Sequence, residues 1–360
     1  MTKHTMRLLP AMMLLAYAGL APAAGFQALE QNASGLGTAY AGSAAIADSA
    51  ATMFANPAGL TRLAGFNVSF GAVGVAESHK FQNAAGVSSG GDAGNTNVLP
   101  NAFVSWQAIP GLSFGLGISR PFLNDIKYNA GWDGATEGLK SEITTLNLNP
   151  AVAYQVNDKV SLGLGLNYQQ LDMRYTDAAP TSFKGDDSAL GWNAGALFTL
   201  SPAMRVGVAY RSKIDHDVAG VDVDTPASFT LSVWQQVSDH WEAMGDLSYT
   251  HWSGVDDLDF DNSWRLAWGT AYKLSEVTKL KFGVAYERSP VGSSNRPVQM
   301  PDSDRLWLSL GGQWKLGRAS LVDVGYAYRY MRDAKINDGA AVGKYENGAH
   351  VLGVQYTVGF

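Results

Sequence analysis

Residues 350–360 read H-V-L-G-V-Q-Y-T-V-G-F, and their side chains alternate in character. Successive side chains of a β-strand point to opposite faces, so every second residue shares a face. One face holds Leu352, Val354, Tyr356, Val358 and Phe360, and the other holds Val351, Gly353, Gln355, Thr357 and Gly359. The chain is therefore predicted to end in a strand with one apolar face and one mostly small or polar face. Its last residue is aromatic.

The same period of two recurs from about residue 66 to the carboxyl terminus. In residues 204–211, for example, the apolar side chains are opposed by Arg205, Gly207, Ala209 and Arg211. We predict an all-β, antiparallel fold of about fourteen strands, centred near residues 70, 103, 116, 149, 166, 194, 208, 232, 247, 268, 283, 310, 325 and 353. Short predicted turns alternate with longer connections near residues 77–97, 122–141, 173–187, 213–226, 253–262, 289–303 and 332–344.

The composition places the chain outside the cytoplasm and argues against nucleic acid as a partner. Lys3 and Arg7 precede an apolar stretch at residues 8–20 and a small-residue cleavage site at residues 21–23, which is the pattern of a secretory signal peptide. Removing residues 1–23 takes the net charge from −6 to about −8, because two basic side chains are lost. An acidic chain of this kind does not suit nucleic acid. There is no cysteine, so disulfides and thiol chemistry do not apply.

The pattern of strands and connections indicates what surrounds the apolar faces of the predicted strands. No stretch after residue 23 has about eighteen or more consecutive apolar residues, so no membrane-spanning helix is expected. Alternating strands joined in turn by short and long connections are typical of an outer-membrane barrel. A soluble β-sandwich or lipocalin-like barrel also alternates, but the strand number and the glycine-rich polar faces disfavour it. We predict a transmembrane β-barrel over residues 66–360, monomeric, in the bacterial outer membrane and in contact with lipid and lipopolysaccharide.

Residues 24–65 lack sustained alternation and are rich in small side chains. A barrel of about fourteen strands is wider than one that its own side chains fill. We therefore predict that residues 24–65 form a plug, or hatch, inside the lumen, and a periplasmic extension is the alternative. The bulky side chains that would pack such a plug are Leu36, Tyr40, Ile46, Met53 and Phe54.

Several segments carry a family resemblance in their order and spacing. Asn56, Pro57 and Ala58 form an Asn-Pro-Ala motif downstream of Ala-Gly-Phe-Gln at residues 24–27. Further segments are Gly-Trp-Asn-Ala-Gly at 191–195, Tyr-Arg-Ser at 210–212 and Pro-Asp-x-Asp-Arg-x-Trp-Leu-Ser at 301–309. Together they resemble the FadL family of outer-membrane transporters for long-chain fatty acids and other hydrophobic compounds.

The resemblance implies a fourteen-stranded barrel with an internal hatch and passive uptake without an energy-coupling partner. It also implies a kinked third strand that opens a side gap, through which ligand leaves into the membrane. Glycine and proline weaken strand pairing, so Gly115, Gly117 and Pro121 are candidates for the kink. Pro121 has an alternative role, which is to end the strand at the outer rim. The outer loop that captures ligand in this family corresponds here only to residues 172–187.

Candidate ligand and gating residues follow from the resemblance and from partition energetics. An acyl chain gains about 0.8 kcal/mol per methylene on leaving water, so its site must be apolar. Phe26, near the mature amino terminus, is expected to line or plug this pocket, and the hatch with its Asn-Pro-Ala motif is expected to gate it. Arg174 and Arg296 are candidate partners for a ligand carboxylate, unless they contact lipopolysaccharide or form structural ion pairs. We predict no catalytic residue, metal site or cofactor.

Other functions remain open at this point. Aromatic hydrocarbons are alternative ligands for the same route if few basic groups face the lumen. An outer-membrane lipid hydrolase needs a serine–histidine pair, for which His251 and Ser253 are the tempting combination. A structural or adhesive surface protein is expected to carry long loops, whereas several predicted loops are short.

Overall fold

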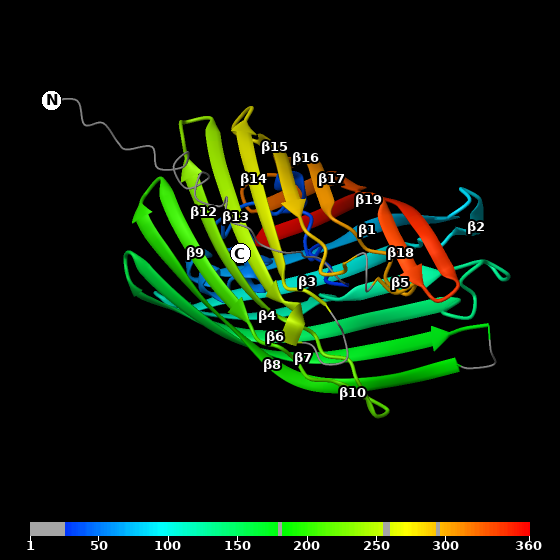
Figure 1. Cartoon of the computed structure of the whole chain (residues 1–360). Coiled ribbons are helices and arrows are strands. Elements are labelled where there is room, and N and C mark those ends of the chain that lie inside the picture. Colours follow the sequence, from blue (N-terminus) through cyan, green and yellow to red (C-terminus); the bar gives the residue numbers. More distant parts are fainter. Residues whose placement is uncertain (1–25, 179–181, 255–259, 293–295) are drawn as a thin grey trace.

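The computed structural model describes residues 26–178, 182–254, 260–292 and 296–360, and the predicted signal peptide lies outside these ranges. Long antiparallel strands dominate the fold (Figure 1). The fourteen long strands are β1 (Phe66–Asn83), β3 (Thr96–Ile109), β4 (Leu112–Ser119), β6 (Lys140–Asn157), β7 (Val160–Thr176), β8 (Ser182–Ser201), β9 (Met204–Arg211), β12 (Ala227–Gln236), β13 (Trp241–His251), β14 (Ser263–Lys273), β15 (Thr278–Glu287), β16 (Arg305–Lys315), β17 (Ser320–Met331) and β19 (Ala341–Gly359).

Pairing between the first and last strands closes the sheet into a barrel. β1 pairs with β3 on one side and with β19 on the other, from Asn67↔Gly359 to Asn83↔Gly343. This closure confirms the predicted fourteen-stranded antiparallel barrel. The short segments of the chain are β2 (Ser88–Asp92), β5 (Leu123–Lys127) and β18 (Ala334–Asp338) in the same sheet, and the separate hairpin β10 (Asp217–Val218) and β11 (Val221–Asp222).

The two faces of the strands differ in the way that the alternation predicted. In β19, Leu352 and Val354 are exposed on the outer face, whereas Val351 and Gln355 are fully buried inside the barrel. Exposed leucine, valine and aromatic side chains continue this apolar surface over the other long strands. A contiguous apolar surface of this extent marks contact with a membrane or a partner. Among the described residues, no helix is long and apolar enough to cross a membrane.

The two ends of the barrel have connections of different length. The end that holds Phe66 and Phe360, here called the terminal end, has short turns, and the opposite end is called the loop end. Several predicted loops are wrong in extent, because β5 lies within the predicted loop 122–141, and β18 and the start of β19 lie within 332–344. β1 continues to Asn83 through part of the predicted loop 77–97, and β7 pairs with β8 as far as Thr176↔Ser182, well into the predicted loop 173–187. Polar residues maintain backbone pairing in these extensions, so alternation of apolar residues did not reveal them.

Residues 26–65 lie inside the barrel and are called the hatch. Their short helices are η1 (Leu36–Thr38), α2 (Thr52–Ala55) and η2 (Pro57–Arg62); a further turn, η3 (Trp252–Gly254), follows β13. η1 contacts β14 to β17, whereas η2 contacts β3, β4 and β6 to β8. The hatch therefore reaches opposite walls of the lumen, and Figure 1 shows its blue ribbon enclosed by the strands.

Glycines on the inner face let the hatch backbone approach the barrel wall. A Cβ atom at Gly163 of β7 would overlap the backbone of Pro57 and Ala58. A Cβ atom at Gly283 of β15 would overlap the backbone of Thr38. The glycine-rich polar faces seen in the sequence thus accommodate a close backbone approach.

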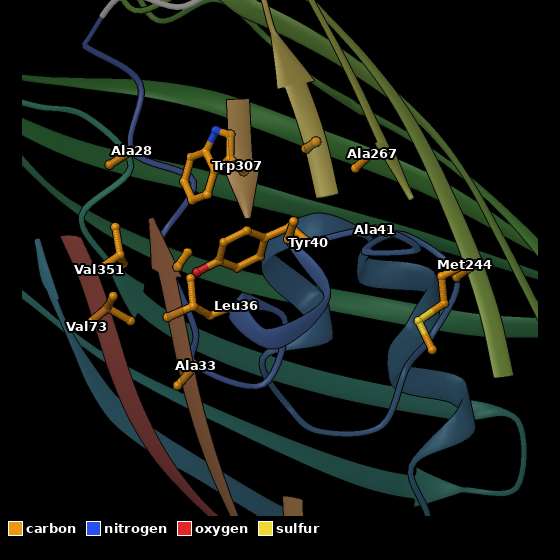
Figure 2. Close-up of a cluster of buried hydrophobic side chains, with 14 of the residues drawn as sticks. Ala28, Ala33, Leu36, Tyr40, Ala41, Val73, Met244, Ala267, Trp307 and Val351 are labelled. Atoms are coloured by element: carbon orange, nitrogen blue, oxygen red, sulfur yellow. The ribbon is translucent and has the colours of Figure 1, made fainter. Parts of the chain in front are cut away.

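An apolar cluster joins the hatch to the barrel. Leu36 and Tyr40 of the hatch pack together with Val73 of β1, Val351 of β19 and Trp307 of β16 (Figure 2). The rings of Tyr40 and Trp307 meet edge to face with their centroids 6.3 Å apart. Full burial of one leucine side chain contributes about 1.5–3 kcal/mol, so this cluster holds the hatch against one wall of the lumen.

Candidate functional site

The third strand of the barrel is interrupted near the loop end. β4 ends at Ser119, and the chain resumes as β5 at Leu123. On the β6 side the pairing continues across the interruption, from Ser119↔Asn147 to Leu123↔Thr144. The register shifts there by one residue, which marks a local irregularity of the β-bulge kind.

On the β3 side the backbone hydrogen bonds are interrupted. The ladder between β3 and β4 ends at Ala102↔Ile118 and returns as an isolated bridge at Gly94↔Ile126. Between these two pairs, the described residues of the two strands make no backbone pairing. We call this gap in the hydrogen-bond ladder the window.

The interrupting residues, 120–122, pair with the hatch instead of with β3. The backbone N–H of Ala28 donates to the carbonyl of Pro121 over 2.8 Å, and that of Leu123 donates to the carbonyl of Phe26 over 2.8 Å. Proline has no backbone N–H to give to a neighbouring strand. The carbonyl of Pro121 accepts its hydrogen bond from Ala28 of the hatch, inside the lumen. The chain therefore turns inward toward the hatch at Pro121.

Polar side chains secure both borders of the window. The side chain of Gln31 in the hatch makes two hydrogen bonds to the backbone of Arg120. Its Nε2 donates to the Arg120 carbonyl over 2.7 Å, and its Oε1 accepts from the Arg120 N–H over 2.8 Å. Across the gap, Asn95 and Asn97 donate to the carboxylate of Asp125 over 3.0 and 3.2 Å. Side chains here replace the missing backbone ladder.

Of the three residues expected to kink the third strand, only Pro121 lies at the interruption. Gly115 and Gly117 pair regularly with both β3 and β6. A Cβ atom at Gly115 would come within 2.8 Å of Leu60, and one at Gly117 within 2.7 Å of Phe103. These two glycines make room for inner side chains and do not bend the strand.

An apolar cluster around Phe26 occupies the lumen near the loop end. The ring centroid of Phe26 lies 5.7 Å from that of Phe122 and 5.1 Å from that of Trp252, and Phe260 packs against Trp252 at 6.2 Å. The other buried members are Ile143, Leu171, Val218, Val223, Val291 and Met300. Phe26 is only 3% exposed, so its ring fills the middle of an apolar pocket.

A cavity of about 90 Å³ lies next to this cluster and to the window. Pro121 and Phe122 line it from the interrupted strand. The hatch contributes apolar side chains such as Leu29 and Phe54, and the barrel wall contributes mainly polar ones. Ligand sites of proteins commonly combine an apolar lining with a few placed polar groups.

Two arginines bring positive charge to the cavity. The Nε of Arg265 lies 4.0 Å from the carboxylate of Glu287. Arg211 donates from Nη2 to the carbonyl of Phe54 over 3.0 Å, and from Nη1 to the side-chain oxygen of Asn167. Within the described part of the chain, no carboxylate lies within salt-bridge distance of Arg211.

Amide side chains surround this arginine. Asn149 and Asn167 both donate to Oδ1 of Asn193, over 2.9 and 3.1 Å. Asn193 lines the cavity, and its Nδ2 has no hydrogen-bond partner among the described residues. This wall of the cavity therefore keeps an unused donor beside a positive charge.

The Asn-Pro-Ala motif anchors the hatch. Asn56 caps η2, because its Oδ1 accepts from the backbone N–H of Ala58 over 3.0 Å, and Pro57 occupies the first turn. The Nδ2 of Asn56 also donates to the carbonyls of Ala44 and Ala196, over 2.8 and 3.0 Å. The motif thereby ties the hatch to itself and to β8.

The structure does not bring the two arginines expected from the sequence to the cavity. Arg174 is half exposed on the outer face, with Nη1 3.7 Å from Glu142. Arg296 is buried before β16, where its guanidinium donates to the carbonyls of Val291, Asp302 and Lys335. Sequence reasoning missed Arg211, although the alternation in residues 204–211 placed it on the polar face.

The serine and histidine considered for a hydrolase are not arranged for catalysis. The Oγ of Ser253 donates to Oδ1 of Asn262 over 2.9 Å. In the described structure no hydrogen bond joins Ser253 to His251, and Trp252 is buried between them. A serine nucleophile needs a base within hydrogen-bond reach.

Comparison with known proteins agrees with this architecture. The family model for "Outer membrane protein transport protein (OMPP1/FadL/TodX)" matches residues 14–224 and 219–360. The chain belongs to the OMPP1/FadL/TodX family. It is 32% identical to outer membrane protein P1 of Haemophilus influenzae, with 91% of this chain and 90% of that protein covered. It is 27% identical to the long-chain fatty acid transport protein of Escherichia coli strain K12, with 94% of each covered.

Solved structures of OMPP1/FadL/TodX proteins share the fold. A Pseudomonas aeruginosa FadL homologue superposes with a TM-score of 0.85 at 20% identity, covering 94% of this chain and 100% of that one. The Pseudomonas putida toluene transporter TodX gives a TM-score of 0.72 at 14% identity, covering 91% and 98%. Family membership confirms the predicted resemblance and the predicted outer-membrane location. Outer-membrane barrels have short periplasmic turns, so the terminal end faces the periplasm.

Proposed function

We propose that this member of the OMPP1/FadL/TodX family takes up long-chain fatty acids, or molecules of similar hydrophobic character, across the outer membrane without energy input. An acyl chain enters the apolar cluster around Phe26 and leaves sideways through the window into the membrane. This path spares the chain the periplasmic water, where each exposed methylene costs about 0.8 kcal/mol. The observation that carries the proposal is the interrupted third strand, since Pro121 and Phe122 line the lumenal cavity next to the window.

Phe26 is proposed as the gate because it belongs both to the apolar cluster in the lumen and to the border of the window. Its ring fills the apolar cluster, while its carbonyl accepts the N–H of Leu123 at the start of β5. A ligand that displaces the ring also pulls on this hydrogen bond and loosens the border of the window. The Asn-Pro-Ala motif holds the rest of the hatch in place during this movement.

A neutral aromatic hydrocarbon is the second candidate ligand. The cluster offers the rings of Phe122, Trp252 and Phe260 around Phe26, and aromatic rings pack favourably edge to face. Uptake of labelled palmitate and labelled toluene by cells that carry this protein as their only family member separates the two ligand classes. We further propose a monomer that contacts lipid and lipopolysaccharide and that catalyses no reaction.

The window itself is tested by cross-linking it. The chain has no cysteine, so Asn97→Cys with Asp125→Cys creates a single thiol pair, and these side chains are 3.2 Å apart in the native protein. A short bis-maleimide that joins them is expected to reduce palmitate uptake to background. The matched control is Gln82→Cys with Glu346→Cys, whose side chains are 2.9 Å apart and solvent-accessible on the regular β1–β19 ladder. Equal uptake through both cross-linked proteins contradicts lateral exit at the window.

A further inference from the structure

We propose that Arg211 binds the anionic headgroup of the ligand, with a carboxylate as the simplest case, in the cavity beside the window. This inference rests on the proposed function and adds the chemical class of the cargo. It assigns the charge recognition to a residue of β9 on the inner face of the barrel.

The first observation is a partly buried positive charge without a counter-charge among the described residues. A buried cation is costly unless a counter-charge lies nearby. Arg329, a fully buried arginine of the lumen, has two counter-charges: Glu30 at 3.0 Å, and Glu77, with which it forms a short ion pair. Arg211 instead contacts neutral groups, namely the Phe54 carbonyl, the Asn167 side chain and the Phe54 ring, whose centroid is 4.8 Å from the guanidinium carbon. One unit of positive charge is therefore left for a ligand to neutralise.

The second observation is a donor without a partner. Asn193 is 3% exposed, lines the same cavity as Arg211, and its Nδ2 makes no hydrogen bond to the described residues. A buried polar group without a partner costs free energy. A carboxylate has two oxygens and accepts from a guanidinium and an amide at once. Asn193 and Arg211 are cross-strand partners of β8 and β9, so one headgroup reaches both.

The cavity also has the polarity of an amphiphile. Arg211 and Asn193 stand on the barrel wall, whereas Leu29 and Phe122 form apolar parts of the lining. Phe122 belongs as well to the apolar cluster around Phe26. A head at Arg211 thus places the tail among apolar side chains at the edge of the window.

One acidic residue lines the same cavity and has its own partners. The carboxylate of Asp246 accepts hydrogen bonds from the hydroxyls of Ser43, Ser232 and Ser248 over 2.8, 2.6 and 2.8 Å. Its oxygens are engaged by these hydroxyls, and Asp246 is not within salt-bridge distance of Arg211.

The experiment compares two ligands that differ only in the head. Palmitate and hexadecanol share a sixteen-carbon chain, and their binding to the full-length protein in a non-ionic detergent is measured by displacement of a fluorescent fatty acid. The wild type is expected to prefer palmitate by about tenfold or more, which corresponds to about 1.4 kcal/mol. Arg211→Gln is expected to lose this preference while it still binds hexadecanol, and Arg211→Lys to retain most of it.

Arg205→Gln is the matched control. Arg205 lies on the same face of β9, donates to the hatch carbonyls of Ala45 and Ile46, and stacks 3.9 Å from the Trp234 ring, but it does not line this cavity. Its variant is expected to keep the preference for palmitate. Equal binding of both ligands by the wild type, or a preference that survives in Arg211→Gln, overturns the inference and leaves the proposed function standing. Binding of neither ligand refutes the proposed function itself.

Discussion

His216 is a buried histidine in the loop between β9 and β12. Its Nδ1 donates to the carboxylate of Asp187 over 3.0 Å, and the Nε2 of Gln169 donates to its Nε2 over 3.1 Å. This pair of hydrogen bonds requires a neutral ring, because a protonated Nε2 would face another donor. Burial lowers the pKa of His216, and the neighbouring Asp187 only partly opposes this effect.

The loop that carries His216 is therefore expected to loosen in acid. Histidine in an unfolded chain is protonated below about pH 6.5, and in the folded protein only at lower pH. The stability that the neutral His216 ring gives to the folded loop is therefore complete above about pH 6.5. It is lost as the pH falls through the lowered pKa of His216. Hydrogen exchange of residues 213–225, corrected for intrinsic rates, should rise as the pH is lowered from neutral to about 5. His216→Gln should show no such step, and an unchanged wild type contradicts the expectation.

At the scale of single residues, the sequence predicted which face of a strand a side chain lies on, but it did not predict which residues contact that side chain. Alternation placed both Arg205 and Arg211 on the inner face of their strand. It did not predict that Phe54 and Asn167 would contact Arg211, because those contacts depend on how distant segments pack. The same limit applies to Arg296, whose carbonyl partners come from the segment between β15 and β16 and from β18.

At the scale of elements, the third strand shows that a proline interrupts a strand when residues elsewhere bind the interrupted backbone. Pro121 removes one donor, but the inward turn also depends on hatch residues that receive the strand. From the sequence, Gly115, Gly117 and Pro121 were all candidates for the kink, and Pro121 had the alternative role of ending the strand at the outer rim. Only the register of β3 and β6 showed that the two glycines lie in regular ladder and the proline does not.

Gln31 is expected to hold the turn in place. Gln31→Leu removes both side-chain hydrogen bonds to Arg120, and each bond to a buried backbone group contributes about 0.5–1.5 kcal/mol. Amide hydrogen exchange at Arg120, Phe122 and Leu123 should become about five- to 150-fold faster, as that energy range implies for two bonds. Gln82→Leu is the control, since the side chain of Gln82 donates to the exposed Glu346, far from Arg120 in the sequence. Unchanged exchange in Gln31→Leu shows that the backbone pairing with Phe26 and Ala28 suffices.

At the scale of the whole molecule, the exposed apolar side chains on the outer face of the long strands form a surface that we call the apolar belt. The alternation that produces this belt made the fold predictable from the sequence, and the belt contacts the lipid in the folded protein. All fourteen strands were predicted near their observed centres because every transmembrane strand repeats the same period of two. The ends were predicted less well. Strands such as β7 and β8 continue beyond the belt, where the lipid no longer imposes alternation.

The belt predicts a cost that depends on depth. Leu164 is 61% exposed at the middle of the apolar row on β7, and Leu164→Arg should destabilise the folded barrel in lipid by about 2–4 kcal/mol. Gln170→Arg, on the same strand near its loop end, should cost about 0–1 kcal/mol. Reversible unfolding by guanidinium in liposomes measures both values. A similar cost at the two positions contradicts a lipid-facing belt centred near Leu164.

The hydrogen bonds and ion pairs of the hatch have a consequence for biogenesis. The hatch leaves the ribosome before any strand, yet its Ala33 N–H donates to Gln355 of β19 and its Glu30 pairs with Arg329 of β17. Such long-range partners exist only after synthesis of the carboxyl-terminal strands. The hatch therefore completes its contacts only when the carboxyl-terminal strands are in place, and its full docking reports that those strands are present.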